Sequence, residues 1–319
     1  MNSTHRLAAV NSINWARILA QITYYFYSYF TLLHANPSLT TQGIRFVVPT
    51  GNFGDILAGY FAKRMGLPIE KLVIATNEND ILHRFWQTGS YEKNPAFPAP
   101  HQSGQHIHDL PAEDKHVDGV KETLSPAMDI LVSSNFERLL WFLSYEVHGE
   151  GHSVPERRKI AGAQVKSWLT ELKTSGGFSV DERILSAARN TFESERVSDE
   201  QTVATIKAVY GWPETTSQPR RYILDPHSAI GVTAALRSRE RAKSSHHVSL
   251  ATAHPAKFSH AVELALRNEK DFNFKSVLPD QFVGLVDLPR RVTDVNKSNG
   301  LNGLRALIIR EVDQEREAR

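Results

Sequence analysis

Residues 47–59 constrain the fold more than any other stretch of this chain. The apolar run Val47-Val48-Pro49 is followed by a turn bracketed by Gly51 and Gly54, and then by a helical pattern that begins at Asp55. A buried strand, a glycine turn and a helix start bring free main-chain N–H groups and the positive end of a helix dipole to one place. The sequence therefore predicts an anion site at this turn, and phosphate is the expected anion.

The composition indicates a soluble globular protein. Of the 319 residues 41% are hydrophobic and 23% are charged, and the formal net charge is +2. This balance excludes a disordered chain and gives nucleic-acid binding no electrostatic support. The chain has no cysteine, which excludes disulfides, thiolate metal sites and a thiol nucleophile, and fits a cytoplasmic protein. No signal peptide is visible and the most apolar run, residues 22–33, is shorter than a bilayer span, so no membrane partner is expected.

Strand and helix patterns alternate along most of the chain. Strands are expected at 45–49, 72–76, 221–224 and 247–251, and helices at 11–34, 55–65, 136–147, 155–174, 181–193, 199–210, 229–242, 256–266 and 301–316, with another after 77–80. This alternation predicts an α/β, three-layer αβα fold with a mainly parallel sheet. Ligands of such sheets bind beyond the carboxyl ends of the strands, where the turns at 49–55, 225–228 and 252–255 are expected.

Two polar features leave alternatives open. In the first helix, whose expected cap residues are Asn11 and Ser12, the residues Asn14, Arg17 and Gln21 share one face, which is either a solvated stripe or a wall of a site. Between residues 93 and 120, His101, His106, His108 and His116 lie in a stretch rich in proline and glycine. No helical or hairpin spacing fixes these histidines as ligands, so we favour a surface loop and predict no metal site.

The turn at 50–55 lacks the signatures of nucleotide sites. There is no G-x-x-x-x-G-K-[ST], so no lysine reaches a terminal phosphate, and no G-x-G-x-x-G, so a dinucleotide is not expected. A phosphate held only by main-chain amides suits a phosphorylated cofactor. Asp55 is unfavourable beside a phosphate, and its alternative role is to complement the helix dipole.

Several motifs together resemble the threonine synthases of the fungal and bacterial type, which are pyridoxal-phosphate enzymes with the tryptophan-synthase-β fold (fold type II). The resemblance covers most of residues 9–290. The motifs stand in family order: Asn11 to Arg17, Val47 to Tyr60, Ile74 to Asp80, Leu124 to Ile130, Ser194 to Ser198, Leu224 to Ala229 and Ala251 to Phe258. The implied reaction converts O-phospho-L-homoserine and water into L-threonine and phosphate.

The resemblance also implies roles for individual residues. Gly51, Asn52, Phe53, Gly54 and Asp55 match the loop around the cofactor phosphate. Ser228 matches a position that is usually threonine, whose hydroxyl bonds the pyridine nitrogen; serine keeps that hydroxyl. A hydroxyl partner need not hold this nitrogen protonated. Ser12, Asn14 and Arg17 match a motif that faces the substrate, with Arg17 suited to its phosphate. Lys257 either shares that role or is a solvated surface lysine.

The resemblance places the Schiff-base lysine before the Asn-Ser-Ile-Asn motif, which here begins at residue 11. No lysine present stands in a comparable context; Lys93 comes closest but opens the loop rather than ending a strand, so no catalytic residue is assigned. We therefore expect residues 1–319 to form one N-terminally truncated large domain, with a loop insertion at about 93–120 and a helical segment at about 135–210. Truncation predicts exposed apolar surface, including on the 13–33 helix, and poor solubility.

Three interpretations follow. The chain is the carboxyl-terminal piece of a threonine synthase, a lyase that is inactive alone because the lysine is missing. Alternatively, it is another elimination enzyme of the same fold, which the Asn-Ser-Ile-Asn and Asp-Pro-His motifs argue against. Third, it is a non-enzymatic remnant that binds pyridoxal phosphate or a partner. The sequence does not indicate an oligomeric state.

Overall fold

The computed structural model describes residues 11–36, 43–93, 119–213, 221–289 and 292–317. The chain divides into two compact units, Met1–Val277 and Leu278–Arg319. The expectation of one truncated large domain stays a prediction. The histidines at 101, 106, 108 and 116 lie outside the described residues, so the interpretation of that loop stays a prediction. None of the described helices is long and apolar enough to cross a bilayer.

A sheet of four parallel strands forms the centre of the first unit. Its order is β5 (Phe192–Arg196), β2 (Ile69–Thr76), β1 (Ile44–Pro49) and β6 (His246–Ser249). Parallel neighbours need crossover connections, and helices supply them here. The carboxyl ends of β1 and β6 therefore lie at the same edge, and the turns that follow them meet there. A second, antiparallel pair joins β3 (Ser90–Glu92) to β4 (Gly177–Ser179).

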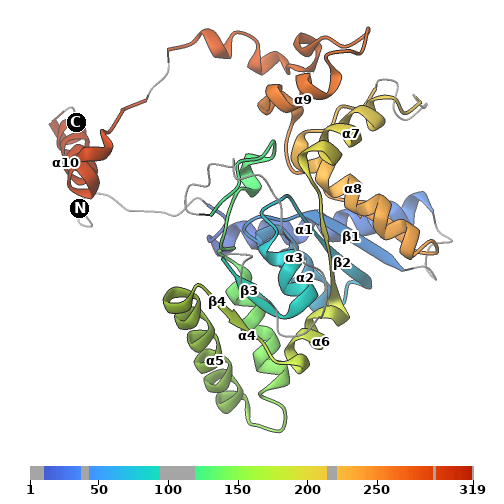
Figure 1. Cartoon of the computed structure of the whole chain (residues 1–319), viewed down its shortest axis with the longest axis vertical. Helices are drawn as coiled ribbons and strands as arrows, with labels where there is room; N and C mark the ends of the chain where they lie inside the picture. Colours follow the sequence, from blue (N-terminus) through green and yellow to red (C-terminus); the bar gives the residue numbers. More distant parts are fainter. Residues whose placement is uncertain (1–10, 37–42, 94–118, 214–220, 290–291, 318–319) are drawn as a thin grey trace, which may run out of the picture. The chain divides into compact units, whose positions relative to one another are not determined.

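Helices cover both faces of the sheet, as Figure 1 shows. Alternate strand residues point to opposite sides: Phe46 and Ile74 join the core under one set of helices, whereas Val47 and Val73 pack against the other face. The first set comprises α1 (Trp15–Ala35), α2 (Gly54–Arg64), α3 (Ile81–Thr88), α4 (Phe136–Val147), α5 (Val154–Ser175) and α6 (Glu182–Thr191). The helix on the other face is α8 (Pro226–Arg241), and α7 (Asp199–Tyr210) and α9 (Ser259–Leu266) pack beside it. The three-layer α/β prediction is confirmed.

Two local predictions are wrong. Residues 221–224 form no strand: Arg221 and Tyr222 are exposed, and the buried Leu224 packs with α7 and α9 rather than joining the sheet. Conversely, β5 lies inside the segment at about 135–210 that was predicted to be helical. The helix α6 ends before Phe192, whose side chain enters the core beside β2. The strand was not predicted because residues 193–196 are mostly charged and show no apolar alternation. The glutamates of this run form ion pairs with arginines of neighbouring elements.

The N-cap of α1 is Asn14 rather than the expected Asn11 or Ser12. The Asn14 side chain accepts a hydrogen bond from the Ala16 N–H at 2.9 Å, as a helix N-cap does. Ile18 and Tyr25 are fully buried against α2 and the sheet. The opposite face is apolar yet uncovered by any described residue, with Tyr24, Tyr27 and Phe30 exposed by 50%, 75% and 59%. The exposed apolar surface expected on this helix is therefore present.

We expect this face of α1 to drive self-association. Replacing Tyr27 and Phe30 with lysine should shift the chain toward the monomer at micromolar concentration, since each removes a large exposed ring and adds repulsion. Sedimentation velocity checks the result. The matched control places lysine at Thr23 and Thr31, which are exposed on the same helix. It adds the same charge but removes no large apolar side chain. A wild-type chain that is already monomeric would contradict the expectation.

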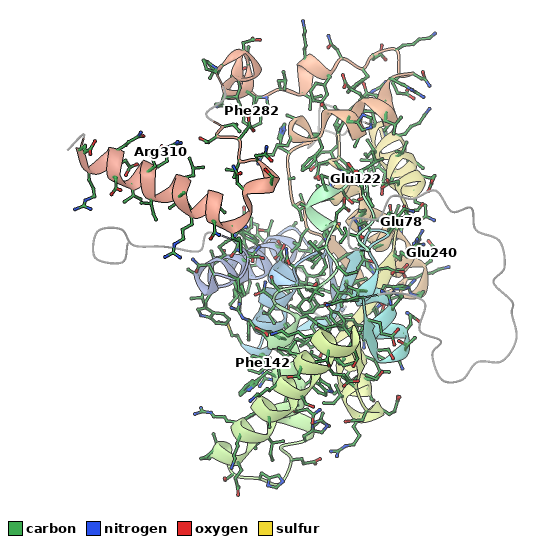
Figure 2. The ribbon with its side chains drawn as sticks, turned by 60° about the vertical axis from the view of Figure 1, so that its left-hand side comes forward. Glu78, Glu122, Phe142, Glu240, Phe282 and Arg310 are labelled. Atoms are coloured by element: carbon green, nitrogen blue, oxygen red, sulfur yellow. The ribbon has the colours of Figure 1, made fainter. Side chains whose placement is uncertain are left out.

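The second unit contains short 3₁₀ turns and one long helix, α10 (Gly300–Glu317). None of the described residues of α10 is buried, and its side chains, including Arg310, project outward from the helix (Figure 2).

Candidate functional site

The turn between β1 and α2 presents a row of main-chain N–H groups. Thr50 N–H still donates to Ala75 O at 2.8 Å, as an extension of the sheet. In contrast, none of the N–H groups of residues 51–56 has a hydrogen-bond acceptor among the described residues. These donors belong to the turn and to the first residues of α2, where the helix dipole is positive. The predicted anion cradle therefore has the donors that such a site requires.

The carbonyl groups of the same turn accept hydrogen bonds from the segment 133–135. Gly51 O accepts from Ser133 Oγ, and Asn52 O accepts from the Asn135 N–H at 3.2 Å and from Asn135 Nδ2 at 2.9 Å. Asn135 is fully buried. Because the segment 133–135 fixes the carbonyls, the N–H groups of the turn keep one orientation. Sequence reasoning missed Ser133 and Asn135, since nothing in their spacing links them to a turn about 80 residues earlier.

Two residues of the turn have their conformation set by close packing. Phe53 adopts φ 62° and ψ 9°, the left-handed region that costs a bulky residue energy. Its ring packs with Trp86, Phe136 and Phe192 at centroid distances of 6.1, 5.4 and 6.0 Å, so its side chain anchors the turn in the core. At Gly51, a Cβ would lie 3.1 Å from Ala127 O. Glycine at this position therefore favours the close approach of the turn to residues 126–128.

Asp55 lies in the first turn of α2, half-buried, and accepts from the Tyr25 hydroxyl at 3.3 Å. Burial raises the pKa of Asp55 to about 6, and the Tyr25 hydrogen bond opposes this only in part. Burial and the nearby carboxylate also raise the pKa of Tyr25 well above its usual value, so Tyr25 stays a donor. A carboxyl group that titrates near neutrality can lie beside a phosphate without carrying a full charge at slightly acidic pH.

Asp55 should make stability depend on pH. Its folded pKa of about 6 exceeds its unfolded value near 3.8, so its favourable contribution is present below pH 3.8 and is lost as the pH rises through 6. The loss amounts to about 3 kcal/mol. We expect Asp55→Asn to unfold at higher urea concentration than wild type at pH 7.5 and at a similar one at pH 4. Glu137→Gln, an exposed first-turn acid of α4, is the control. A difference independent of pH would contradict this assignment.

Ser228 lies in the first turn of α8 and is buried. Its hydroxyl donates to Asp225 Oδ2 and accepts from the Thr252 N–H at 3.1 Å. The preceding His227 accepts from the Ala127 N–H at 3.2 Å, and Ala127 O is the atom that closely approaches Gly51. The three-residue turn 126–128 thus connects the start of α8 with the cradle. Ser228 and the cradle share one edge of the sheet, although residues 225–228 follow no strand.

The residues predicted to bind substrate separate into two groups. Ser12 lies beside the cradle: a Cβ on Gly54 would be 3.4 Å from Ser12 Cβ, and Ser12 O accepts from Asn135 Nδ2 at 3.1 Å. Asn14 uses its side chain to cap α1, and Arg17 is exposed on that helix. Lys257 is also exposed. Ser12 thus contacts the elements of the cradle, and the roles of all four residues stay predictions.

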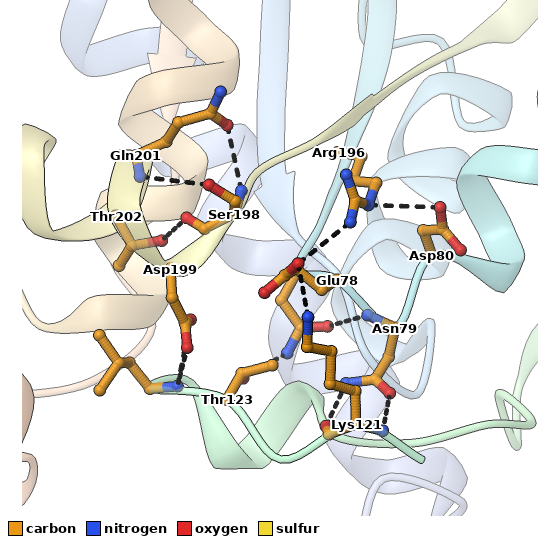
Figure 3. Close-up of polar contacts among 12 residues, drawn as sticks. Glu78, Asn79, Asp80, Lys121, Thr123, Arg196, Ser198, Asp199, Gln201 and Thr202 are labelled. Atoms are coloured by element: carbon orange, nitrogen blue, oxygen red, sulfur yellow. Dashed lines mark hydrogen bonds and ion pairs between the residues drawn. The ribbon is translucent and has the colours of Figure 1, made fainter. Parts of the chain in front are cut away.

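A polar cluster lies at the carboxyl ends of β2 and β5 (Figure 3). Glu78 pairs with Lys121 at 2.9 Å and with Arg196 at 3.1 Å, and Arg196 also reaches Asp80 at 3.4 Å. Beside it is a cavity of about 360 Å³, lined by Glu78, Asn79, Asp80, Ile81, Arg84, Lys93, Gly119, Lys121, Ile130 and Leu131. Ile130 Cδ1 would be 3.6 Å from a Cβ on Gly51, so the cavity adjoins the cradle. The sequence analysis identified residues 74–80 as a family-like motif but did not predict a cavity beside them.

The comparisons with known proteins agree with this geometry. The family model described as "Threonine synthase, C-terminal" matches residues 228–308. The threonine synthase of Saccharomyces cerevisiae is 49% identical over 301 residues, which cover 93% of this chain and 52% of that protein, and the one of Schizosaccharomyces pombe is 47% identical with 93% and 53% coverage. The chain thus spans about half the length of the curated relatives it matches.

Solved structures give the same result. The crystal structure of threonine synthase from yeast matches with a TM-score of 0.78 and 47% identity, covering 96% of this chain and 54% of that one. A threonine synthase from Brucella melitensis, described as bound to PLP (pyridoxal phosphate), matches with a TM-score of 0.65 and 42% identity, covering 91% and 50%. The mainly parallel sheet and the similarity to these solved structures identify the fold as fold type II of the pyridoxal-phosphate enzymes. In sequence and in fold the chain is similar to about half of a threonine synthase, and its residues 228–308 match the carboxyl-terminal family model.

Proposed function

We propose that residues 51–56 and Ser228 bind pyridoxal phosphate, and that this chain supplies the phosphate-binding part of a threonine synthase. The observation that carries the proposal is the row of main-chain N–H groups at 51–56 that lack an acceptor among the described residues. Such donors at a helix start fit a phosphate ester better than a neutral ligand. The PLP named in the Brucella melitensis structure supports the choice of cofactor.

Different residues of this chain bind the two ends of the cofactor. The amides of the cradle hold the phosphate, while Asn135 and Ser133 keep these amides oriented through the carbonyls behind them. Ser228, near the other end, bonds the ring nitrogen through its hydroxyl group. When bound, pyridoxal phosphate supplies an electron sink for elimination and replacement chemistry at an amino acid. The family reaction, from O-phospho-L-homoserine and water to L-threonine and phosphate, is the one we propose for the assembled enzyme.

We assign no catalytic lysine to this chain. Five of the described lysines have printed side-chain partners outside the cradle: Lys63 with Ile69 O, Lys71 with Arg189 O, Lys121 with Glu78, Lys207 with Glu269 and Lys243 with Glu240. We therefore propose that residues 1–319 alone bind the cofactor non-covalently and do not turn over substrate. The substrate side is formed by Ser12 and the cavity beside Ile130, with Asn14 and Arg17 further along α1.

Borohydride reduction tests this proposal. The chain is incubated with pyridoxal phosphate, treated with borohydride and digested for mass spectrometry, and a parallel sample is measured by equilibrium dialysis. We expect saturable binding without a reduced adduct fixed at one lysine. An adduct at a single lysine, or phosphate release from O-phospho-L-homoserine by this chain alone, would contradict the absence of a Schiff-base lysine. A lack of saturable binding would overturn the proposed cradle.

A further inference from the structure

Asp55 is the one acidic residue among residues 51–56, and its carboxylate does not bind the free amides of its own turn. An acidic side chain in the first turn of a helix ordinarily accepts hydrogen bonds from the N–H groups there, because the helix dipole favours a negative charge at that end. Here Asp55 Oδ1 accepts instead from the Tyr25 hydroxyl at 3.3 Å. The carboxylate is therefore diverted from the cradle to α1.

The Tyr25 hydroxyl lies on the side of Asp55 that faces away from the start of α2. It donates to the main-chain O of Asp55 at 2.8 Å as well as to the carboxylate. In an α-helix the carbonyl groups point toward the C-terminus, whereas the N–H groups point toward the N-terminus. A group that binds the Asp55 carbonyl therefore lies further along the helix, on the side opposite to the free amides. By binding the same hydroxyl, the carboxylate is turned to that side.

Close packing holds the Tyr25 ring in place. Tyr25 is fully buried, and its ring lies 5.0 Å from that of Phe46 in β1, measured between centroids. Gly59 of α2 makes room for it: a Cβ there would lie 2.6 Å from Tyr25 Cε1 and 2.7 Å from Tyr25 Cζ. Burial also raises the pKa of Tyr25 well above its usual value, so the hydroxyl keeps its proton and remains a donor. The hydroxyl is thus a fixed partner for Asp55.

The other polar groups described around the start of α2 leave this contact undisturbed. The uncharged side chains of Gln21, from α1, and Asn135 come within 4 Å of the point where a Cβ would lie on the first residue of α2. Arg138 of α4 is charged, but it is engaged with Asn135 Oδ1 at 2.8 Å. Burial raises the pKa of Asp55 to about 6, and the hydrogen bond from Tyr25 opposes this. The carboxyl group is therefore mostly charged at pH 8.5 and mostly neutral at pH 5.

We propose that Tyr25 is a positioning residue that holds the Asp55 carboxylate away from the cradle, so that the amides of the cradle stay free for a phosphate group. Without the Tyr25 hydroxyl, the carboxylate turns to the free N–H groups of its own turn, where it competes with the phosphate for donors and repels its charge. The inference rests on the proposed function, because it requires the phosphate of pyridoxal phosphate in the cradle. It explains how an acidic residue can belong to an anion site.

The test measures the affinity of the full chain for pyridoxal phosphate by equilibrium dialysis at pH 8.5 and pH 5. Each variant is compared with wild type at the same pH, so that titration of the ligand's own phosphate cancels. Tyr25→Phe keeps the buried ring and removes only the hydroxyl. We expect it to weaken binding by at least about tenfold at pH 8.5, where the released carboxylate is charged. At pH 5 the loss should nearly disappear, because a neutral carboxyl group does not repel the phosphate.

Adding Asp55→Asn to Tyr25→Phe should restore the affinity at pH 8.5, since the amide carries no charge. Gly59→Ala provides a second route if Tyr25→Phe does not fold, because its methyl group displaces the Tyr25 ring and should cause the same pH-dependent loss. The control is Tyr60→Phe, which removes another buried hydroxyl of α2, one that accepts from Arg64 Nη1 at 3.0 Å, and should leave the affinity unchanged.

Three results would overturn the inference. They are an unchanged affinity in Tyr25→Phe, a loss that is equal at the two pH values, and a loss that persists after Asp55→Asn is added. An equal or persistent loss would mean that the hydroxyl acts only through the packing of α1. A wild-type chain without saturable binding would refute the proposed function instead, so the two failures are distinguishable.

Discussion

Phe53→Ala is expected to destabilise the protein by about 3–5 kcal/mol, the usual cost of deleting a buried aromatic ring. The ring is 1% exposed and packs against Trp86, Phe136 and Phe192. Its loss leaves a cavity under the cradle and removes the contacts that hold residue 53 at φ 62°. Urea unfolding followed by circular dichroism measures the change. The same variant should also bind pyridoxal phosphate more weakly, because the orientation of the turn depends on this anchor.

Two further variants separate packing from backbone strain. Phe53→Leu retains much of the buried volume and should lose less stability than Phe53→Ala. Phe53→Gly relieves the left-handed conformation but leaves the largest cavity. We therefore expect the stability of Phe53→Gly to exceed that of Phe53→Ala by at most about 1 kcal/mol. A Phe53→Ala protein with wild-type stability and affinity would show that the ring does not fix the turn.

Gly51→Val should weaken pyridoxal-phosphate binding by about 100-fold while the protein stays folded. A Cβ at Gly51 would lie 3.1 Å from Ala127 O and 3.2 Å from Met128 Cα, and both are main-chain atoms that cannot rotate away. Overpacking of this kind costs about 1–3 kcal/mol, and moving the turn away from residues 126–128 would place that cost on the cradle. Equilibrium dialysis gives the affinity. Gly51→Ala should have a smaller effect of the same sign.

A glycine in open space provides the control for this experiment. A Cβ on Gly162, in the middle of α5, would have no atom within 4 Å. Gly162→Val should therefore leave the affinity for pyridoxal phosphate unchanged. If Gly51→Val bound the cofactor as tightly as the control, the close approach of the turn to residues 126–128 would have no role in binding.

The sequence predicted the main features of the fold because they depend on local patterns. The apolar strands β1 and β2, the glycine turn and the helices α4 and α7 follow from apolar periodicity and caps. β5 could not be predicted in this way, because Glu193 and Glu195 are half-buried through ion pairs with arginines of β1 and α8. The failed strand at 221–224 had the apolar residues of a strand, but Leu224 is buried against helices.

The site was predictable only where it is contiguous in sequence. The donors of the cradle belong to one turn, so its strand–turn–helix pattern identified them. Ser133 and Asn135 act on the same turn from about 80 residues away, and their role depends on tertiary packing alone. The Asp225–Ser228 contact is local, yet the Thr252 N–H that also donates to Ser228 lies 24 residues further along the chain.

The central claim, that the amides of residues 51–56 hold a phosphate group, is tested most directly by NMR. Pyridoxal phosphate is titrated into ¹⁵N-labelled protein, and the main-chain amide resonances are followed. We expect the resonances of residues 51–56 to shift together and to saturate, as they should when free N–H groups gain a charged acceptor. Pyridoxal, which lacks the phosphate, should leave them unshifted at the same concentration. Saturable binding that leaves these six amides unchanged would contradict the claim.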